Sequence, residues 1–283
     1  ALLSRWFDRP LAITARGSDV NLIAQHVVPR AWMRWASRVA SASIAVSSAL
    51  AERMGAIGMP ADRISVLRNG VDLTRFRPLP QAQARETLGW PDAPTLIAVG
   101  NLVENKGQHL AIRALAALPG FRLHIVGDGP QAKALAELAG HLGVADRVRF
   151  LGSVAQDELA LHYSAADALV LASSREGAPN VVLEAMACGL PVIGTAVGGT
   201  PEVMKPPTTG ALMAERTVDA LVQAVHHVWQ RGVDRDAIRR HAQGCGWART
   251  TREQIALFRR LANRWQAKDS SHEAAGRSVG GAP

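Results

Sequence analysis

Cysteine and tyrosine are both rare in this sequence. The 283 residues include two cysteines, Cys188 and Cys245, and a single tyrosine. Two cysteines cannot form a disulfide framework, so a reducing compartment is the simplest expectation. Neither cysteine belongs to a Cys/His group with the spacing of a zinc site. We therefore expect a chain that folds without disulfide bonds and without a bound metal.

Long apolar runs and base-stacking aromatic clusters are also absent. No apolar run reaches the ~18 to 20 residues that cross a bilayer. Hydrophobic residues make up 48% of the chain and charged residues 20%, which is typical of a globular protein. The net charge of +8 suits an anionic partner such as a nucleotide phosphate or a lipid surface. Without aromatic clusters beside it, this charge does not indicate a nucleic acid.

Buried strands alternate with helical runs over most of the chain. Short apolar runs predict strands at Thr95–Val99, Phe121–Val126, Val148–Leu151, Ala168–Ala172, Pro191–Ile193 and Gly210–Met213. Helical runs fill the gaps, for example Gln108–Leu118 and Gln131–Leu142. Such alternation is typical of an α/β protein with a parallel, doubly wound sheet.

The first 75 residues carry a shorter version of the same pattern. Strands are expected at Leu11–Thr14, Ser43–Ser47 and Ile64–Leu67, with a helix at Ala31–Ala42 between the first two. This β-α-β pattern predicts the second half of a Rossmann-like domain whose first half is absent from the sequence. Asn69 and the residues after it give a tight-turn signal followed by extended, proline-marked chain, which suits a hinge.

The helix expected at Ala31–Ala42 is both aromatic and basic. Its two faces carry Trp32, Trp35 and Val39 on one side and Arg30, Arg34 and Arg38 on a neighbouring side. One interpretation is a helix that lies on a membrane surface. The other is a packed helix whose basic face is solvated.

The stretch from Ser173 to Glu184 is the one around which the chain is organised. Glu176 is predicted in the loop after the strand Ala168–Ala172, and Glu184 about one turn into a helix spanning Val181–Cys188. Both carboxylates can then face the crevice outside the strand ends, where open α/β sheets bind ligands. The loop ends at a helix N-terminus, whose free N–H groups favour an anion. Taken alone, two solvated helix glutamates remain the alternative.

A second constellation, Gly100–Gly107, follows the strand Thr95–Val99. Lys106 is expected just before a helix, where the helix dipole disfavours a cation by ~0.3–1 kcal/mol. A bound diphosphate would remove that conflict, because each charge-assisted contact contributes ~1.5–3 kcal/mol. An exposed lysine at a loop end is the alternative, and the residues alone leave both interpretations open.

Three further segments complete a recognisable pattern: Ala165–Asp167, Glu184–Ile193 and Gly198–Glu202. With the two glutamates separated by seven residues, they resemble the donor-binding domain of retaining glycosyltransferases of family four, the glycogen-synthase-like and sucrose-synthase-like type. The resemblance extends from about Asn69 to Trp247. It implies the GT-B fold, an α/β fold with two Rossmann-like domains, here with the first truncated at its N-terminus.

This resemblance divides the chain into four parts. Residues 1–75 are expected to form a partial N-terminal, acceptor-side Rossmann-like domain, and residues 76–245 the C-terminal domain that binds a nucleotide-sugar donor. Residues 246–266 are expected to form a closing helix that crosses back to the first domain. Residues 267–283, which are polar and rich in Ser, Gly and Ala, are expected to form a disordered tail.

The resemblance also implies roles for particular side chains. Glu176 and Lys106 are the expected catalytic residues, holding sugar hydroxyls and stabilising the diphosphate charge respectively, while Glu184 binds the ribose. The expected donor-binding residues are Gly100, Asn101, Lys106, Gly127, Leu151, Glu176, Gly177, Ala178, Asn180, Val181 and Glu184. Retention is generally explained by same-face attack, in which the leaving phosphate helps to deprotonate the acceptor. This scheme requires neither a metal nor a cofactor.

Two positions depart from the family pattern. Arg16, followed by Gly17, stands where the family commonly has a histidine, so that role is not carried over; a contact with a phosphate or an acidic acceptor group is expected instead. The alternative is that Gly17 makes a turn and that Ser18 or Asp19 caps the following helix. Asn101 stands where the family usually has arginine. This difference predicts weaker binding of the diphosphate, or a replacement of the missing positive charge by Arg16 or Arg175.

The expected function is transfer of a sugar from a nucleotide-diphosphate sugar, such as a UDP-sugar, to a glycan or lipid-linked acceptor. Such a transferase serves polysaccharide biosynthesis at the cell envelope, in the cytoplasm at the inner face of the membrane, with peripheral membrane contact. The alternatives are a donor-binding module without transferase activity and a sugar-nucleotide epimerase of the same fold, against which the pair of glutamates argues. The sequence leaves the nucleotide base, the sugar, the acceptor and the oligomeric state open.

Overall fold

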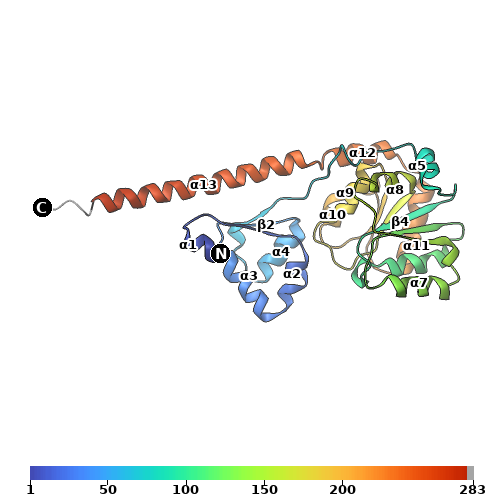
Figure 1. The fold of residues 1–283 in the computed structure, drawn as a ribbon, viewed down its shortest axis with the longest axis horizontal. Coiled ribbons are helices and arrows are strands. Elements are labelled where there is room, and N and C mark those ends of the chain that lie inside the picture. The colour runs from blue at the N-terminus through green and yellow to red at the C-terminus, as the bar shows by residue number, and fades with distance from the viewer. Residues whose placement is uncertain (279–283) are drawn as a thin grey trace. The chain divides into compact units, whose positions relative to one another are not determined.

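The computed structural model describes residues 1–278, which form two compact units, each with its own parallel sheet. Unit 1 comprises Ala1–Arg68 and the chain from Ala248 onward, and unit 2 comprises Asn69–Trp247 (Figure 1). The predicted α/β class with two Rossmann-like sheets is confirmed. The units divide after Arg68 and Trp247, whereas the sequence placed the domain boundaries after residues 75 and 245.

Unit 1 is built on three parallel strands in the order β1-β2-β3. They are β1 (Ala12–Ala15), β2 (Ala42–Ala45) and β3 (Ile64–Val66), each within two residues of its predicted position. The helical elements are α1 (Leu2–Trp6), α2 (Ser18–Asn21), η1 (Ile23–Gln25), α3 (Val27–Val39), α4 (Ser48–Ala56), η2 (Ala61–Arg63) and α13 (Trp247–Ser278). Helix α3 begins four residues before its predicted start, because Pro29 is tolerated in the first turn of a helix.

Helix α13 packs on the sheet of unit 1. Leu257 and Leu261, one turn apart on α13, are buried in one cluster with Ile44 of β2 and Leu67. The guanidinium of Arg9 lies 4.3 Å from the centre of a ring of Trp265. The helix continues to Ser278, so residues 267–278 are helical and not the disordered tail that was predicted; residues 279–283 of that predicted tail lie outside the described residues.

Unit 2 contains a six-stranded, all-parallel sheet in the order β6-β5-β4-β7-β8-β9. Its strands are β4 (Thr95–Val99), β5 (Arg122–Val126), β6 (Val148–Gly152), β7 (Ala168–Leu171), β8 (Val192–Thr195) and β9 (Gly210–Met213). Strand order reverses between β4 and β7, which pair directly. This is the topological switch point, and open α/β sheets bind ligands at the carboxyl ends of the strands there.

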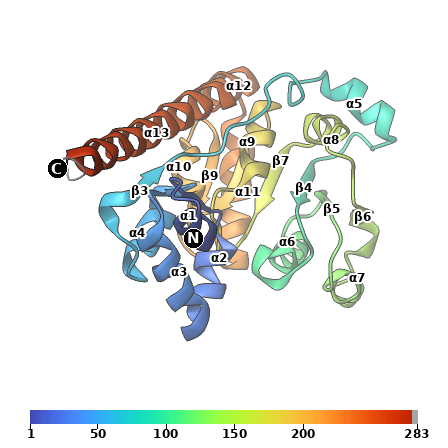
Figure 2. The same ribbon diagram turned by 60° about the vertical axis from the view of Figure 1, so that its left-hand side comes forward.

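Helices cover both faces of the six-stranded sheet (Figures 1 and 2). The helical elements of unit 2 are α5 (Gln81–Leu88), η3 (Glu104–Lys106), α6 (Gln108–Ala114), η4 (Leu115–Ala117), α7 (Ala132–His141), η5 (Ala145–Arg147), α8 (Leu159–Ala165), α9 (Asn180–Ala187), α10 (Thr200–Val203), α11 (Val218–Arg231) and α12 (Arg235–Gln243). Along β4 and β7, Ile97 and Leu169 join the core beneath α8, α9 and α12. Their neighbours Leu96 and Val170 point to the other face and pack with α6, α7 and α11.

The central strands β4 and β7 are therefore apolar on both faces along most of their length, as expected of a parallel sheet covered by helices. This leaves the ends of the strands as the places where polar side chains gather. Among the described residues, no helix combines the length and the apolarity that a bilayer span requires.

Candidate functional site

The candidate site lies at the switch point of unit 2, where the chain leaves β4 and β7. The two strands pair in parallel, Leu96 beside Ala168 and Ile97 beside Leu169, so both chains leave the sheet at the same edge. After β4 the chain enters η3, which carries Lys106. After β7 it enters a loop that carries Glu176 and then starts α9. Parallel pairing thus places two segments about 70 residues apart in sequence at one edge.

Lys106 and Glu176 form an ion pair at this edge. Nζ of Lys106 lies 2.7 Å from Oε1 of Glu176, and their side chains are 26% and 8% exposed. A cation just before α6 is disfavoured by the helix dipole, and the carboxylate of Glu176 offsets that cost. The pair is part-buried, where an opposite charge is screened less than at the surface. The two residues expected to be catalytic are therefore in direct contact.

Close backbone approaches hold the loops of this edge together. A Cβ on Gly107, whose φ is 77°, would lie 2.1 Å from the carbonyl oxygen of Ala172. A Cβ on Gly198, whose φ is 53°, would lie 1.9 Å from the carbonyl oxygen of Glu176. Both positions combine positive φ with a contact that no side chain tolerates, so both require glycine. The Glu176 loop is thus packed against the loop that follows β8.

Arg216, which follows β9, joins the same loops. Its Nε donates a hydrogen bond of 2.7 Å to the carbonyl of Ala172, and its Nη2 donates one of 3.1 Å to the carbonyl of Glu104. These bonds connect the end of β7 with η3, the element that carries Lys106. Sequence reasoning missed Arg216, because nothing in its local sequence marks it as a partner of backbone groups 44 and 112 positions away.

Glu184 lies on the second turn of α9 and is 9% exposed. The hydroxyl of Tyr163 donates a hydrogen bond of 3.0 Å to its Oε2. Burial raises the pKa of Glu184, while the bond from Tyr163 and the charge of Arg75 act in the opposite direction. Sequence reasoning missed Tyr163, because its bond to Glu184, 21 positions further along the chain, depends on how α8 and α9 pack.

The loop that leads into α9 carries the backbone groups expected to bind the donor. The carbonyl of Gly177 accepts a hydrogen bond of 3.1 Å from the amide of Gly199. Helix α9 begins at Asn180, and Oδ1 of Asn180 accepts a hydrogen bond of 2.8 Å from Nδ2 of Asn69. Ala178 and Val181 flank this start. The first amides of α9 therefore lie in the segment between Glu176 and Glu184.

The remaining predicted donor-binding residues lie at the ends of β4, β5 and β6. The amide of Gly100 donates to the carbonyl of Val126, and the amide of Gly127 donates to the carbonyl of Gly152, directly after Leu151. The carbonyl of Asn101 accepts a hydrogen bond of 3.1 Å from Nε2 of Gln108. The side chain of Asn101 is exposed. All eleven predicted donor residues thus belong to unit 2 and to loops, strand ends, η3 or the first turns of α9.

Arg16 and Gly17 belong to unit 1. The carboxylate of Asp19 accepts hydrogen bonds of 3.0 and 2.8 Å from their amides. The carboxylate of Asp19 thus stabilises the turn before α2, whereas α2 has no side-chain cap, so the expected capping of this helix by Ser18 or Asp19 is wrong. The geometry of this loop does not define a ligand, and the acceptor-side role of both residues stays a prediction.

Metal binding and a reaction through Cys188 receive no support from the residues that the structure describes. No group of three or more His, Cys, Asp or Glu side chains among them is arranged to hold a metal ion. Cys188 is buried, and burial raises the pKa of its thiol to about 12. A thiol of that pKa is a poor nucleophile at neutral pH.

Two family models match the chain. The model described as "Glycosyl transferases group 1" matches residues 80–244, and the model described as "Glycosyltransferase Family 4" matches residues 1–75. A D-inositol 3-phosphate glycosyltransferase of Mycobacterium tuberculosis is 36% identical over 224 residues, which are 75% of this chain and 46% of that relative. The chain thus spans less than half the length of this relative.

Solved structures resemble the chain over most of its length. A sucrose-phosphate synthase from Thermosynechococcus elongatus has a TM-score of 0.80 and 26% identity, covering 93% of this chain and 70% of that one. HepE from Anabaena, in complex with UDP and glucose, has a TM-score of 0.79 and 26% identity, covering 90% and 72%. HepE in complex with UDP-glucose has a TM-score of 0.75 and 25% identity, covering 94% and 74%.

Proposed function

Because the chain belongs to the family of glycosyl transferases group 1 and has the GT-B fold, we propose that it transfers a sugar from a nucleotide-diphosphate sugar to an acceptor hydroxyl, with retention of configuration. The observation that carries the proposal is the ion pair of Lys106 and Glu176 at the switch point of unit 2. An ammonium group there suits a diphosphate, and a carboxylate beside it suits sugar hydroxyls.

Each group of the site has a task in this proposal. Lys106 and the first amides of α9 stabilise negative charge that develops on the leaving diphosphate. Glu176, released from Lys106 by the incoming phosphate, accepts hydrogen bonds from the sugar and fixes the anomeric carbon. Glu184 accepts from the ribose hydroxyls. The leaving phosphate oxygen takes the proton of the acceptor hydroxyl on the same face, so no protein base is needed.

The proposed donor is a UDP-sugar. HepE, whose structures contain UDP, UDP with glucose, and UDP-glucose, resembles this chain at 25–26% identity and supports that choice. A direct test is thermal unfolding in the presence of UDP-, ADP-, GDP- and TDP-sugars. A rise in melting temperature with a UDP-sugar is expected, because a ligand that binds only the folded state stabilises it.

Activity is tested by the release of UDP from UDP-glucose with water as the acceptor. We expect Lys106→Met and Glu176→Gln each to lower this rate by roughly 100-fold or more, because each removes a group aligned with the reacting centre. Lys133→Met and Glu137→Gln are the matched controls. Lys133 and Glu137 also form an ion pair in unit 2, with 3.8 Å between Nζ and Oε1, but their side chains are 90% and 58% exposed. The control variants should keep the wild-type rate.

Three outcomes of these tests are informative. Near wild-type rates in Lys106→Met or Glu176→Gln would show that the site is wrongly assigned. No stabilisation by any nucleotide sugar would refute donor binding itself. Stabilisation without release of UDP under any condition would favour the donor-binding module over the transferase. Melting temperatures of all variants must be compared, because removing Lys106 leaves Glu176 without its partner.

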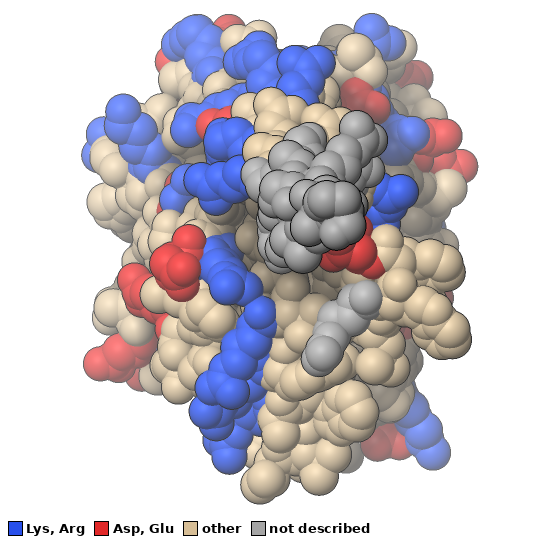
Figure 3. All heavy atoms as spheres, turned by 90° about the vertical axis from the view of Figure 1, so that its left-hand side faces the viewer, with Lys and Arg blue, Asp and Glu red and all other residues tan. Residues whose placement is uncertain are grey.

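We propose a lipid-linked or glycan acceptor, reached by a chain that contacts an anionic membrane surface. Helix α3 of unit 1 supports this: Ser37 is its one buried residue, and Arg30, Arg34 and Arg38 follow one another at a spacing of four. Trp32 is 61% exposed. Figure 3 shows Lys and Arg side chains gathered in a row beside an uncharged surface. Such a combination of basic and apolar side chains is typical of interfacial helices.

A further inference from the structure

Tyr163 is fully buried on α8 and faces Glu184 on α9. Its hydroxyl donates to Oε2 of Glu184, and this is the one hydrogen bond that the Glu184 carboxylate accepts among the described residues. The ring of Phe76 packs against the tyrosine ring, with centroids 6.2 Å apart. Burial raises the pKa of Tyr163 well above its ordinary value, so the hydroxyl stays protonated and acts as a donor.

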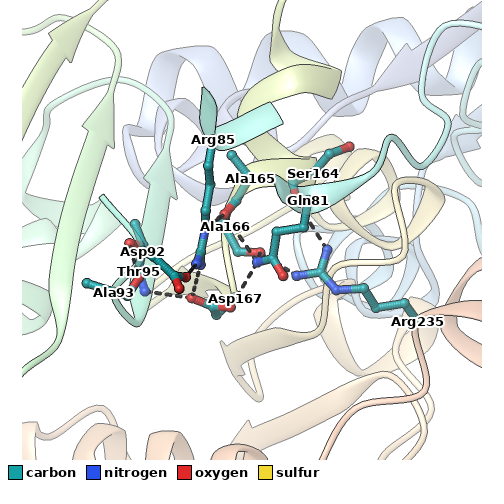
Figure 4. A network of polar contacts seen from close by, with 10 residues as sticks. All are labelled: Gln81, Arg85, Asp92, Ala93, Thr95, Ser164, Ala165, Ala166, Asp167 and Arg235. Carbon is teal, nitrogen blue, oxygen red and sulfur yellow. Dashed lines mark hydrogen bonds and ion pairs between the residues drawn. The ribbon is translucent and has the colours of Figure 1, made fainter. Parts of the chain in front are cut away.

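The end of α8 that carries this tyrosine is held by side chains from α5 and α12 (Figure 4). Gln81 and Arg85 of α5, with Arg235 of α12, donate hydrogen bonds of 2.5 to 3.3 Å to the carbonyls of residues 164–166. These are the last carbonyls of α8, which have no partner within the helix. Asp167, directly before β7, accepts hydrogen bonds from Gln81 and Arg85. The helix end therefore has little freedom to shift, and neither has the tyrosine.

We propose that Tyr163 is a positioning residue for the donor: it holds the Glu184 carboxylate in the orientation that accepts the ribose hydroxyls. This inference rests on the proposed function, because only a nucleotide donor brings a ribose to Glu184. The bond from Tyr163 fixes Oε2 and leaves Oε1 to accept from the ligand. Tyr163 itself is fully buried and does not touch the donor.

The charge of Glu184 gives this role a measurable signature. Burial raises the pKa of Glu184, while Tyr163 on α8 and Arg75 before α5 lower it; Cys188, one turn further on α9, stays a neutral thiol. A protonated Glu184 loses acceptor capacity, so affinity for UDP falls as the pH falls toward this raised pKa. Removing the tyrosine hydroxyl removes a contact that lowers the pKa, so the loss of affinity then begins at a higher pH.

The test compares three variants with the wild-type chain by titration calorimetry, from neutral to acidic pH. The ligands are UDP and 2′,3′-dideoxy-UDP, which differ only in the ribose hydroxyls. Tyr163→Phe removes the hydroxyl and keeps the ring. Ser164→Ala is the control, because it removes a neighbouring buried hydroxyl on α8 that bonds to Ala160 and Leu79 and not to Glu184. Glu184→Gln removes the titrating group.

For the wild type we expect tighter binding of UDP than of the dideoxy analogue. Tyr163→Phe should weaken UDP binding roughly tenfold and leave the affinity for the dideoxy analogue unchanged. The fall in UDP affinity at acidic pH should begin at a higher pH than in the wild type. Ser164→Ala should keep the ribose preference and the pH profile, even if its melting temperature falls. In Glu184→Gln the ribose preference should disappear, and with it the part of the pH dependence that UDP shows and the dideoxy analogue lacks.

Two results would overturn the positioning role. One is an unchanged ribose preference and pH profile in Tyr163→Phe; the other is a fall in UDP affinity at acidic pH that exceeds the fall for the dideoxy analogue and persists in Glu184→Gln. These failures differ from a failure of the proposed function, in which the wild-type chain binds neither nucleotide at any pH.

Discussion

At the scale of single residues, the site consists of charges that compensate one another in the absence of a ligand. Lys106 and Glu176 neutralise each other at 2.7 Å, and Glu184 is held by a tyrosine hydroxyl. In the proposed donor complex, the phosphate contacts Lys106 and the sugar contacts Glu176, and these two contacts replace the ion pair. The free site therefore keeps its two functional side chains near the place where the ligand needs them, which reduces the ordering that binding requires.

Asn101 stands where the family resemblance leads us to expect arginine, and this difference predicts a weaker diphosphate contact. Its side chain is exposed and its carbonyl is bonded to Gln108, so a longer side chain at this position does not disturb a buried contact. We expect Asn101→Arg to tighten UDP binding roughly tenfold, because a charge-assisted hydrogen bond to a phosphate contributes about 1.5 kcal/mol or more.

The measurement is UDP affinity by calorimetry, with Asn101→Gln as the uncharged control of increased length. An Asn101→Arg variant that binds UDP no better than Asn101→Gln would mean that the position does not face the diphosphate. Affinity that falls more steeply with added salt in Asn101→Arg than in the wild type and Asn101→Gln would support a direct charge contact.

At the scale of structural elements, the site depends on loops that touch through their backbones. The loops after β4, β7 and β8 meet at Gly107 and Gly198, each against a carbonyl oxygen of the β7 loop. Arg216 adds hydrogen bonds to two of the same loops. Function thus rests on the geometry of short connections, which a rigid parallel sheet carries at its edge.

Gly198→Ala should displace the Glu176 loop. The added Cβ would stand 1.9 Å from the carbonyl oxygen of Glu176, and alanine also disfavours the φ of 53°. We expect the release of UDP from UDP-glucose to fall by roughly 100-fold, because displacements of about 1 Å at a reacting centre cost that much. Far-UV circular dichroism should remain that of the wild type.

Gly140→Ala is the matched control for this change. Gly140 lies in α7, and a Cβ added there would meet no atom within 4 Å, so alanine is expected to be neutral or stabilising. Equal rates in Gly198→Ala and wild type would show that the close contact is not needed for activity.

Much of this element-level picture followed from the sequence, and part of it could not. Apolar runs predicted the strands to within two residues, because strands covered by helices on both faces have few polar positions. The rule that ligands meet at strand ends placed Glu176 and Lys106 on one edge. Their direct ion pair, and the bonds of Tyr163 and Arg216, depend on how helices and loops pack across tens of residues. No local pattern encodes such contacts.

At the scale of the whole molecule, the chain consists of two units with different chemistry. Unit 2 carries the switch-point site, and unit 1 carries α3 with its basic face and exposed tryptophan. The net charge of +8 favours encounters with anionic partners in general. To distinguish a general electrostatic attraction from a specific membrane-facing helix, arginines of α3 must therefore be compared with an equal number of arginines of unit 2.

Helix α3 should account for binding to anionic vesicles. We expect the chain to sediment with vesicles that contain phosphatidylglycerol, and a variant with Arg30, Arg34 and Arg38 changed to Gln to lose most of this binding, at about 1 kcal/mol per residue. A variant with Arg113, Arg149 and Arg231 of unit 2 changed to Gln carries the same change in charge. Equal losses in both variants would mean that net charge alone is responsible.

The central claim is that the crevice at the carboxyl ends of β4 and β7 binds the nucleotide diphosphate. A crystal structure of the chain with UDP tests it most directly. We predict the diphosphate within hydrogen-bonding distance of Lys106 and the ribose against Glu184, with the ion pair to Glu176 opened. UDP bound elsewhere, or bound there with neither side chain in contact, would contradict the account.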